Sequence, residues 1–226
     1  MARSIIVTGG FGILGQVVAQ AFAAAGEKVA RIDFAPEPRD IISGALDLGG
    51  VDLTDAAATA AALDKVVAAQ GGIDVLVNVA GGFAWEKLDG GSTATWAKMQ
   101  AMNLTSNLTI TQLALPHLAK GGQGCIVNIG AGAAIKAGAG MGAYAASKSA
   151  VHRLTEALAE EVTGQGVTVN AILPSTIDTP TNRADMPDAD FSTWVQPASI
   201  ANVILFLASP AARAITGALI PVTRGG

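Results

Sequence analysis

Short, almost uninterrupted apolar runs recur along the chain and predict buried β-strands. They are rich in Val and Ile, and they lack the polar–apolar alternation of a strand with one face in water. Continuous apolar strands are typical of a parallel sheet that is covered on both faces. The runs lie at residues 5–7, 29–32, 75–79, 125–129, 167–173 and 218–222.

Alanine-rich stretches of helical length separate these runs, at roughly 12–25, 54–69, 92–120 and 142–163. Thr54 and Ser92 are candidate N-caps, because their side-chain oxygens can accept a hydrogen bond from a free backbone N–H. Pro197 suits the first turn of a late helix. Because strand and helix alternate throughout, we predict a single-domain α/β fold over residues 1–226, a Rossmann-type doubly wound parallel sheet of about seven strands.

The longest stretch without a helix or strand pattern spans about residues 175–196. It is too long for an ordinary connection, and loops of this length often cover an active site. We therefore predict a substrate lid there. No linker or low-complexity segment divides the rest of the chain.

Composition narrows the function classes. The net charge is −4 and no basic run occurs, which argues against binding to nucleic acid or to a membrane surface. Cys125 is the single cysteine and the amino terminus is a poor secretory signal, so we expect a cytoplasmic protein. Charged residues make up 14% of the chain, against about 25% in typical domains. We therefore expect part of the surface to be buried in a homodimer or homotetramer.

A glycine-rich loop follows the first predicted strand and opens the first predicted helix. Gly9, Gly12 and Gly15 permit a tight turn, close approach of the backbone to a pyrophosphate, and close packing of helix on strand. The N-terminus of the helix then points its free N–H groups at the phosphates. Such loops also occur as plain turns, but this order favours a dinucleotide site, to which Ile13 and Leu14 also belong.

Two aspartates are candidates for binding the adenosine part of the cofactor. Asp33 ends the second predicted strand, where a carboxylate accepts both ribose hydroxyls of NAD and repels the 2′-phosphate of NADP. We expect NADH to be preferred, with NADP not excluded, and the alternative is a solvated loop aspartate. Asp52, beside Leu53, is placed to accept from the adenine amino group. Its alternative is a local cap next to Thr54.

Tyr144 and Lys148 are four residues apart on a predicted helix and so share one face. A free phenol has a pKa of about 10. A nearby ammonium favours the phenolate, so we expect it to bring the pKa of Tyr144 toward neutrality. The phenol would then act as a general acid in reduction and as a base in oxidation, and the lysine would hold the nicotinamide ribose. A lone pair at this spacing is usually a surface coincidence, so the interpretation depends on the surrounding sequence.

The surrounding motifs occur in the order and spacing of a known family. They are the glycine loop, Asn78-Val79-Ala80-Gly81, Asn103, Tyr144-Ala145-Ala146-Ser147-Lys148, and Pro174 with Thr179. The chain thus resembles the short-chain dehydrogenase/reductase family over essentially its whole length.

This resemblance implies several roles. Ala80 and Gly81 would line the adenosine site, and Asn103 would hold a water that relays protons through the lysine. Thr179, in the segment after Pro174, would bind the nicotinamide carboxamide.

Two departures from the family pattern bear on the substrate. The middle glycine stands at 12, one position earlier than in most members, and Ala131 occupies the position of the family's catalytic serine. Loss of such a transition-state donor costs about 3 kcal/mol in comparable sites. Ordinary ketone reduction is therefore in doubt.

Both departures are typical of the quinonoid dihydropteridine reductase branch, which the chain most resembles. The most specific similar segment runs from Leu173-Pro174 through Asp178-Thr179-Pro180 and Asn182-Arg183 to Trp194. The resemblance implies hydride transfer from NADH to a quinonoid dihydropterin, with Tyr144 as the proton donor. Such a pterin is already electrophilic and needs less help from a second donor.

The substrate pocket is expected to include Phe83, Trp85, Ala131, Met186 and Trp194. Phe83, where that branch carries Trp, would pack on a flat conjugated acceptor such as a pterin. Packing within a loop is the alternative for both tryptophans. His117 and His152 have no third ligand candidate nearby, so we expect no metal site.

Two other functions stay open. One is a general short-chain carbonyl or alcohol dehydrogenase in which a backbone group or water replaces the missing serine. The other is a dinucleotide-binding sensor or structural subunit without turnover. The set of Tyr144, Lys148 and Asn103 argues against the second, whereas Ala131 keeps it open.

Overall fold

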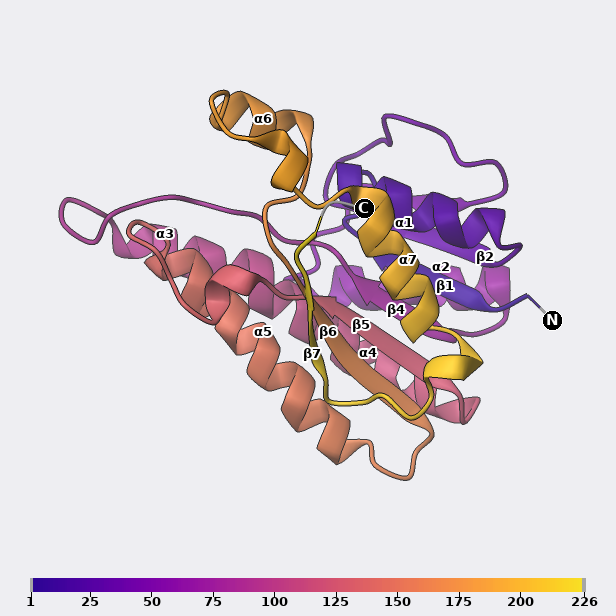
Figure 1. Ribbon diagram of the computed structural model, residues 1–226. Coiled ribbons are helices and arrows are strands. Elements are labelled where there is room, and N and C mark those ends of the chain that lie inside the picture. Colours follow the sequence, from indigo (N-terminus) through magenta and orange to yellow (C-terminus); the bar gives the residue numbers. More distant parts are fainter. Residues whose placement is uncertain (1, 225–226) are drawn as a thin grey trace.

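The apolar runs form the interior of a parallel seven-stranded sheet in the computed structural model, which describes residues 2–224 (Figure 1). β1, β4, β5 and β6 are buried along their whole length, which explains why their sequences do not alternate. The predicted single-domain α/β fold is confirmed. The order across the sheet is β3-β2-β1-β4-β5-β6-β7. The strands are β1 (Ser4–Thr8), β2 (Lys28–Ile32), β3 (Leu46–Leu48), β4 (Val75–Asn78), β5 (Gly124–Ile129), β6 (Val167–Pro174) and β7 (Leu219–Val222).

Helices cover both faces of the sheet. α1 (Ile13–Ala24) and α7 (Pro197–Leu207) pack on one face, and α2 (Ala56–Gln70), α4 (Ser106–Lys120) and α5 (Gly142–Glu161) pack on the other. Successive residues of one strand face opposite helix layers. Ile5 and Val7 of β1 lie in the core beneath α1 and α7, whereas Ile6 lies in the core on the opposite face of the sheet. This is the doubly wound arrangement, with both sheet faces buried.

Helix starts were predicted with mixed success. Ser92 caps α3 (Thr93–Gln100) by accepting a hydrogen bond from the Ala94 N–H, as expected. The predicted cap Thr54 is wrong, because Asp55 accepts from the first free N–H groups of α2. Pro197 stands in the first turn of α7, as predicted. Within residues 2–224, no helix is long and apolar enough to cross a bilayer.

The long helix expected at 92–120 is divided by a π-helical turn. Ala101–Thr105 has this wider winding, between α3 and α4. Such turns insert a residue into a helix and are frequent at functional sites. Asn103 lies at the middle of the turn and is buried, so the irregular winding places one of the predicted catalytic residues.

The strand order reverses between β1 and β4. The chain crosses from β1 to β2 and β3 on one side, and the remaining strands lie on the other. At such a switch point the carboxyl ends of two neighbouring strands leave a crevice, which is where open α/β sheets bind ligands. The glycine loop follows β1, and the segment from Val79 follows β4, so the predicted cofactor motifs meet there.

Candidate active site

A cleft of about 880 Å³ opens at the carboxyl ends of β1 and β4. Its volume lies within the range of about 300–1,000 Å³ that is typical of small-molecule sites. Segments that are distant in sequence meet in its walls. The predicted cofactor residues that line it are Gly9, Gly12, Ile13, Leu14, Gly15, Asp33, Asp52, Leu53, Ala80, Gly81 and Thr179.

The glycine loop forms a cradle at the start of α1. Gly9 has a φ of 61°, in the left-handed region that favours glycine, and a Cβ on Gly15 would overlap the Gly9 carbonyl oxygen. Gly12 is the N-cap of α1, and a Cβ built on it would meet the same oxygen at 3.4 Å. Packing therefore requires Gly15, whereas Gly12 keeps the cleft side of the helix N-terminus open. This cradle fits the pyrophosphate of a dinucleotide.

Asp33 is anchored at one end of the cleft. Its carboxylate accepts hydrogen bonds from the Phe11 and Ala35 N–H groups, both at 2.9 Å. Asp33 is thus held between the glycine loop and the segment that follows β2. It is not the freely solvated aspartate of the alternative interpretation. A carboxylate has further lone pairs, which remain for a ribose hydroxyl.

Asp52 makes the local contact with Thr54 that was the alternative to binding adenine. It accepts from the backbone N–H and the hydroxyl of Thr54, at 2.8 and 2.7 Å, and these bonds lower its pKa. Because Asp52 also lines the cleft, contact with adenine stays a prediction.

A buried arginine supports the glycine loop from behind. The Arg31 guanidinium is fully buried, binds both carboxylate oxygens of Asp47 at 2.6–2.7 Å, and lies 5.2 Å from the centre of the Phe11 ring. A Cβ on Gly10 would overlap the Arg31 side chain, so this glycine is also required. Neither Arg31 nor Gly10 was predicted as part of the site. The available signal was an arginine inside an apolar strand, where a charge needs a partner.

Lys148 projects from α5 toward the end of β5, and Tyr144 lies one turn earlier on the same helix. The Lys148 Nζ is buried and donates to the Ile129 carbonyl at 2.8 Å, and Ile129 lines the cleft. Tyr144 is half-buried, and its ring meets Phe83 edge-on with ring centres 5.0 Å apart. The predicted pair therefore lies on one helix face beside the cofactor cleft.

Burial changes the acidity of this pair in a direction opposite to the expected one. It raises the pKa of Tyr144 to about 12 and lowers the pKa of Lys148 to about 8. The expected lowering of the Tyr144 pKa is wrong for this structure, because removal from water disfavours the charged form of both groups. At neutral pH Tyr144 is a protonated phenol, which suits a proton donor.

Asn103 fastens the segment after β4 to α5. Its Oδ1 accepts from the Gly82 N–H at 2.9 Å, and its Nδ2 donates to the Gly82 carbonyl at 3.1 Å and to the Ser147 hydroxyl at 2.9 Å. A Cβ on Gly81 would overlap the Asn103 Oδ1, which explains that glycine. Asn103 therefore positions the residue next to Lys148, and the relay water stays a prediction.

Two of the predicted substrate residues form an exposed aromatic wall. Phe83 and Trp85 are 56% and 58% exposed. The Trp85 ring lies against Gly140, where a Cβ would overlap it, and the Glu86 N–H donates to the Gly140 carbonyl at 2.8 Å. The segment after β4 and the loop before α5 thus support each other beside Tyr144.

The other three predicted substrate residues have different surroundings. Ala131 is buried at the start of the short turn Gly132–Ala134, and Pro174 ends β6 nearby, with its carbonyl close to Gly132. Met186 is partly exposed after α6 (Pro180–Asp185). Trp194 needs a correction: it is 5% exposed and packs on Phe191 with ring centres 4.7 Å apart, so the packing alternative describes it.

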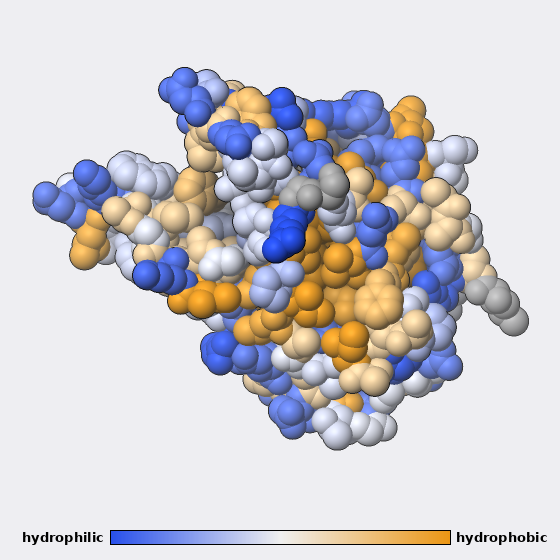
Figure 2. Space-filling model, viewed as in Figure 1, coloured by the Kyte–Doolittle hydropathy of each residue, from blue (hydrophilic) through white to orange (hydrophobic). Residues whose placement is uncertain are grey.

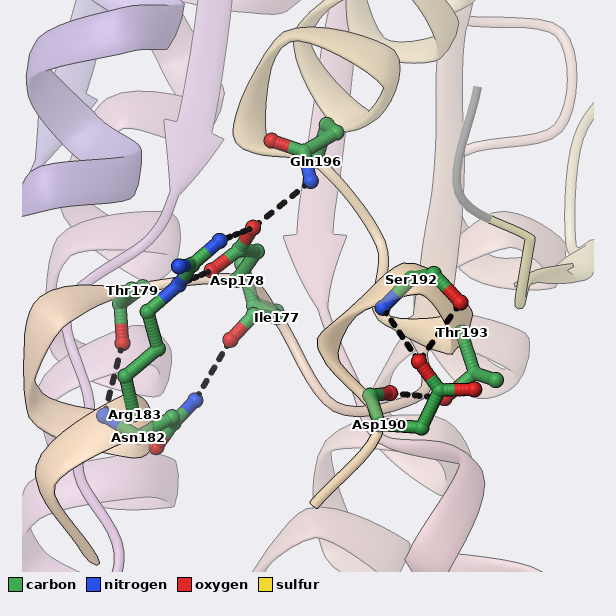
Figure 3. A network of polar contacts seen from close by, with 9 residues as sticks. All are labelled: Ile177, Asp178, Thr179, Asn182, Arg183, Asp190, Ser192, Thr193 and Gln196. Atoms are coloured by element: carbon green, nitrogen blue, oxygen red, sulfur yellow. Dashed lines mark hydrogen bonds and ion pairs between the residues drawn. The ribbon is translucent and has the colours of Figure 1, made fainter. Parts of the chain in front are cut away.

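The predicted lid is closed at its base, and the expectation that it is irregular throughout is wrong, because α6 lies within it. Ile177 and Val195 form a parallel bridge, and the Asp178 N–H donates to the Val195 carbonyl at 2.8 Å. Figure 3 shows the Arg183 guanidinium and the Gln196 amide converging on the Asp178 carboxylate. These bonds lower the pKa of Asp178 to about 2. The two ends of the segment are thereby held together, and the segment between them is too long for an ordinary connection.

Thr179 connects this loop to the cofactor cleft. Its hydroxyl oxygen accepts from the Asn182 N–H at 3.2 Å and thereby caps α6 (Figure 3). The hydroxyl proton is left to donate into the cleft, which agrees with the predicted contact to a carboxamide. Within residues 2–224, no three His, Cys, Asp or Glu side chains gather as a metal site.

Comparison with known proteins identifies the family. The sequence model for short chain dehydrogenases matches residues 3–190. The 2,5-dichloro-2,5-cyclohexadiene-1,4-diol dehydrogenase of Sphingobium indicum is 35% identical, over 97% of this chain and 94% of its own. The 3-oxoacyl-[acyl-carrier-protein] reductase of Vibrio cholerae is 32% identical, over 97% and 95%.

A solved structure agrees with the fold. The ligand-free aldohexose dehydrogenase of Thermoplasma acidophilum superposes with a TM-score of 0.89 at 27% identity, over 98% of this chain and 92% of its own. These matches extend over the glycine cradle, the π-helical Asn103 and the Tyr144–Lys148 pair. The chain belongs to the short-chain dehydrogenase/reductase family and is an NAD(P)-dependent oxidoreductase.

Proposed function

We propose that the protein uses NADH to reduce a flat conjugated acceptor such as a quinonoid dihydropterin, with Tyr144 as the single side-chain proton donor. The observation that carries this proposal is that residue 131 has no hydrogen-bond donor free for a substrate. Ala131 has no hydroxyl, and its N–H already donates to the His152 Nε2 at 3.2 Å. A substrate that depends on a second donor at this position would therefore be poorly stabilised, whereas an electrophilic conjugated ring depends on it less.

The residues around the cleft divide the work of such a reaction. When bound, the cofactor supplies the hydride. The glycine cradle holds its pyrophosphate, Asp33 its adenosine ribose, Lys148 its nicotinamide ribose, and Thr179 its carboxamide. Tyr144 is protonated at neutral pH and donates its proton as negative charge develops on the acceptor. Phe83, held edge-on to Tyr144, offers a flat face to a ring system.

A second candidate function is the oxidation of an alcohol or diol. It is favoured by the similarity to a diol dehydrogenase and an aldohexose dehydrogenase. In that direction Tyr144 must first lose its proton, and burial disfavours the phenolate because it raises the pKa of the phenol. The same shift makes the phenol a weaker acid in reduction, so the pKa of Tyr144 does not decide between the two functions. The non-catalytic alternative loses its support, because the similar proteins are named dehydrogenases and reductases.

Turnover with a panel of acceptors tests the substrate class. We expect NADH oxidation with quinonoid dihydropterin to exceed that with ketones by about 10²-fold or more in kcat/KM, the size of effect that one missing donor produces. Ala131→Ser should leave pterin turnover unchanged and raise the weak ketone reduction. Ala133→Ser, two residues along the same turn, is the control. Faster turnover of ketones or diols than of pterin by the parent would make the alcohol dehydrogenase the better description.

Asp33 is expected to set a preference for NADH. The double variant Asp33→Ala, Phe34→Arg should shift the ratio of kcat/KM values toward NADPH by at least about tenfold, since it removes a repulsive carboxylate and adds a phosphate partner. Asp33 also accepts hydrogen bonds from two backbone N–H groups, so its loss is expected to weaken NADH binding in any case. The test is therefore the ratio of the kcat/KM values for NADPH and NADH. Asp64→Ala, which removes a carboxylate from the exposed face of α2, is the control. A parent enzyme that binds NADPH more tightly would refute this role.

We further propose that the protein is a cytoplasmic homodimer or homotetramer. α5 exposes the small residues Ala146 and Ala157, which would permit a close helix–helix contact. Figure 2 shows a second apolar surface over β7 and α7, where Phe206 is 49% exposed. Light scattering at micromolar concentration should give at least twice the chain mass, and a monomer would contradict the proposal. The single buried cysteine, Cys125, suits a reducing compartment.

A further inference from the structure

A buried histidine beside the proton-transfer pair has no part in the reaction described above. His152 lies on α5 one turn beyond Lys148 and is 3% exposed. We propose that His152 is a positioning residue, which as a neutral hydrogen-bond acceptor fixes the backbone of residues 129–131 and thereby places the carbonyl that holds Lys148. This role does not depend on which acceptor the enzyme reduces.

Three consecutive backbone groups are fixed at the end of β5. The Ile129 carbonyl accepts from the Lys148 Nζ at 2.8 Å, the Gly130 N–H donates to the Ile172 carbonyl at 2.9 Å, and the Ala131 N–H donates to the His152 Nε2 at 3.2 Å. Two of these three partners come from one turn of α5. Loss of the histidine would free the Ala131 end of this short segment, two residues from the carbonyl that holds Lys148.

The approach of the imidazole depends on a glycine. A Cβ on Gly130 would overlap the His152 Nε2 and would also press on the Leu173 side chain. The chain has therefore kept room for the ring directly beside the residue where a side-chain hydroxyl is missing. The buried ring nitrogen accepts a backbone N–H, and a glycine leaves the space that this hydrogen bond needs. The contact is therefore a specific hydrogen bond and not incidental packing.

The contact requires a neutral imidazole. A neutral ring has one accepting nitrogen and one N–H, so a ring that accepts at Nε2 carries its proton on Nδ1. A protonated ring would set an N–H against the Ala131 N–H and break the contact. Burial, followed by the positive charges of Arg153 and Lys148, lowers the pKa of His152, while Glu156 opposes this. These charged groups all lie on α5, and the neighbours from β5 and β6, Gly130 and Leu173, are uncharged.

The hydrogen bond from the Ala131 N–H to His152 also affects which acceptors the enzyme can reduce. This consequence rests on the proposed function. With the Ala131 N–H donated to His152, neither a side chain nor the backbone at position 131 is free to replace the family's serine. His152 would thus restrict the site to acceptors that Tyr144 alone can protonate.

Two substitutions separate positioning from packing. His152→Leu fills the space but cannot accept a hydrogen bond, so it should lower kcat about tenfold or more while the KM for NADH changes less than about twofold, the pattern of a misplaced catalytic group. His152→Gln offers a side-chain oxygen that accepts but does not titrate. It should keep kcat within about threefold of the parent and lose the acidic limb of the pH profile. His117→Leu, on α4, is the control. A His152→Leu enzyme with parental kcat would overturn the proposal.

A spectroscopic measurement tests the contact without any substrate. The chain has two histidines, so ¹⁵N-histidine labelling gives two imidazole signals, which His117→Gln assigns. We expect His152 to show an unprotonated Nε2 and a protonated Nδ1, and to titrate with a pKa below its ordinary value of about 6.5. The opposite tautomer, or titration with an ordinary pKa, would refute the role of His152. Failure of pterin turnover with the expected tautomer would contradict the proposed acceptor and leave the positioning role intact.

Discussion

Replacing Tyr144 by phenylalanine is expected to lower kcat by about 10²–10⁴-fold and to leave NADH binding nearly unchanged. The phenolic proton is needed only as charge develops on the reduced substrate, so its loss falls on the transition state. Burial keeps that proton on the phenol at neutral pH, with a pKa raised to about 12. The variant keeps the ring that makes the edge-on contact with Phe83, so we expect its local packing to be retained.

Steady-state kinetics together with fluorescence titration of NADH separate the two effects. Phe83→Leu serves as the matched control, because it removes the ring partner and retains the phenol. This control should raise the KM for a flat acceptor more than it lowers kcat. If Tyr144→Phe turned over within twofold of the parent, the proton would have to come from water, and the protein would supply only binding and alignment.

The sheet was predictable because its strands are buried on both faces. Their apolar runs are continuous, and the sequence marks them without knowledge of the partner strands. β3 was not marked in this way, because Leu46–Leu48 is short, half-buried and interrupted by Asp47. It is held as a strand by its pairing with β2, and Asp47 also holds Arg31. Such a strand depends on tertiary partners rather than on its own pattern.

The location of the proton-transfer pair was also predictable, since helical spacing alone puts Tyr144 and Lys148 on one face. The acidity of the pair was not, because the pKa of each group depends on how far it is removed from water. The same limit applies to Trp194, whose burial against Phe191 is a tertiary contact. His152 was considered only as a metal ligand, and its actual partner is a backbone N–H on another element.

Replacing Lys148 by alanine is expected to damage both turnover and cofactor binding. The Lys148 Nζ holds the Ile129 carbonyl at the wall of the cleft and, in the proposed mechanism, also binds the nicotinamide ribose. Its removal leaves a buried carbonyl without its donor and removes a buried positive charge one helical turn from the phenol. We expect kcat to fall by about 10²-fold or more, and the Kd for NADH to rise as well.

The pH dependence gives this prediction a direction. Burial lowers the pKa of Lys148 to about 8, so the ammonium is present below that pH and is lost as the pH rises through it. Activity that needs the ammonium should therefore decline above pH 8 in the parent. Lys148→Arg, which stays charged, should retain its own, lower activity through that range. Lys120→Ala, at the end of α4, controls for the loss of a charge elsewhere. An unchanged Kd for NADH in Lys148→Ala would show that the lysine acts on Tyr144 and the Ile129 carbonyl without holding the ribose.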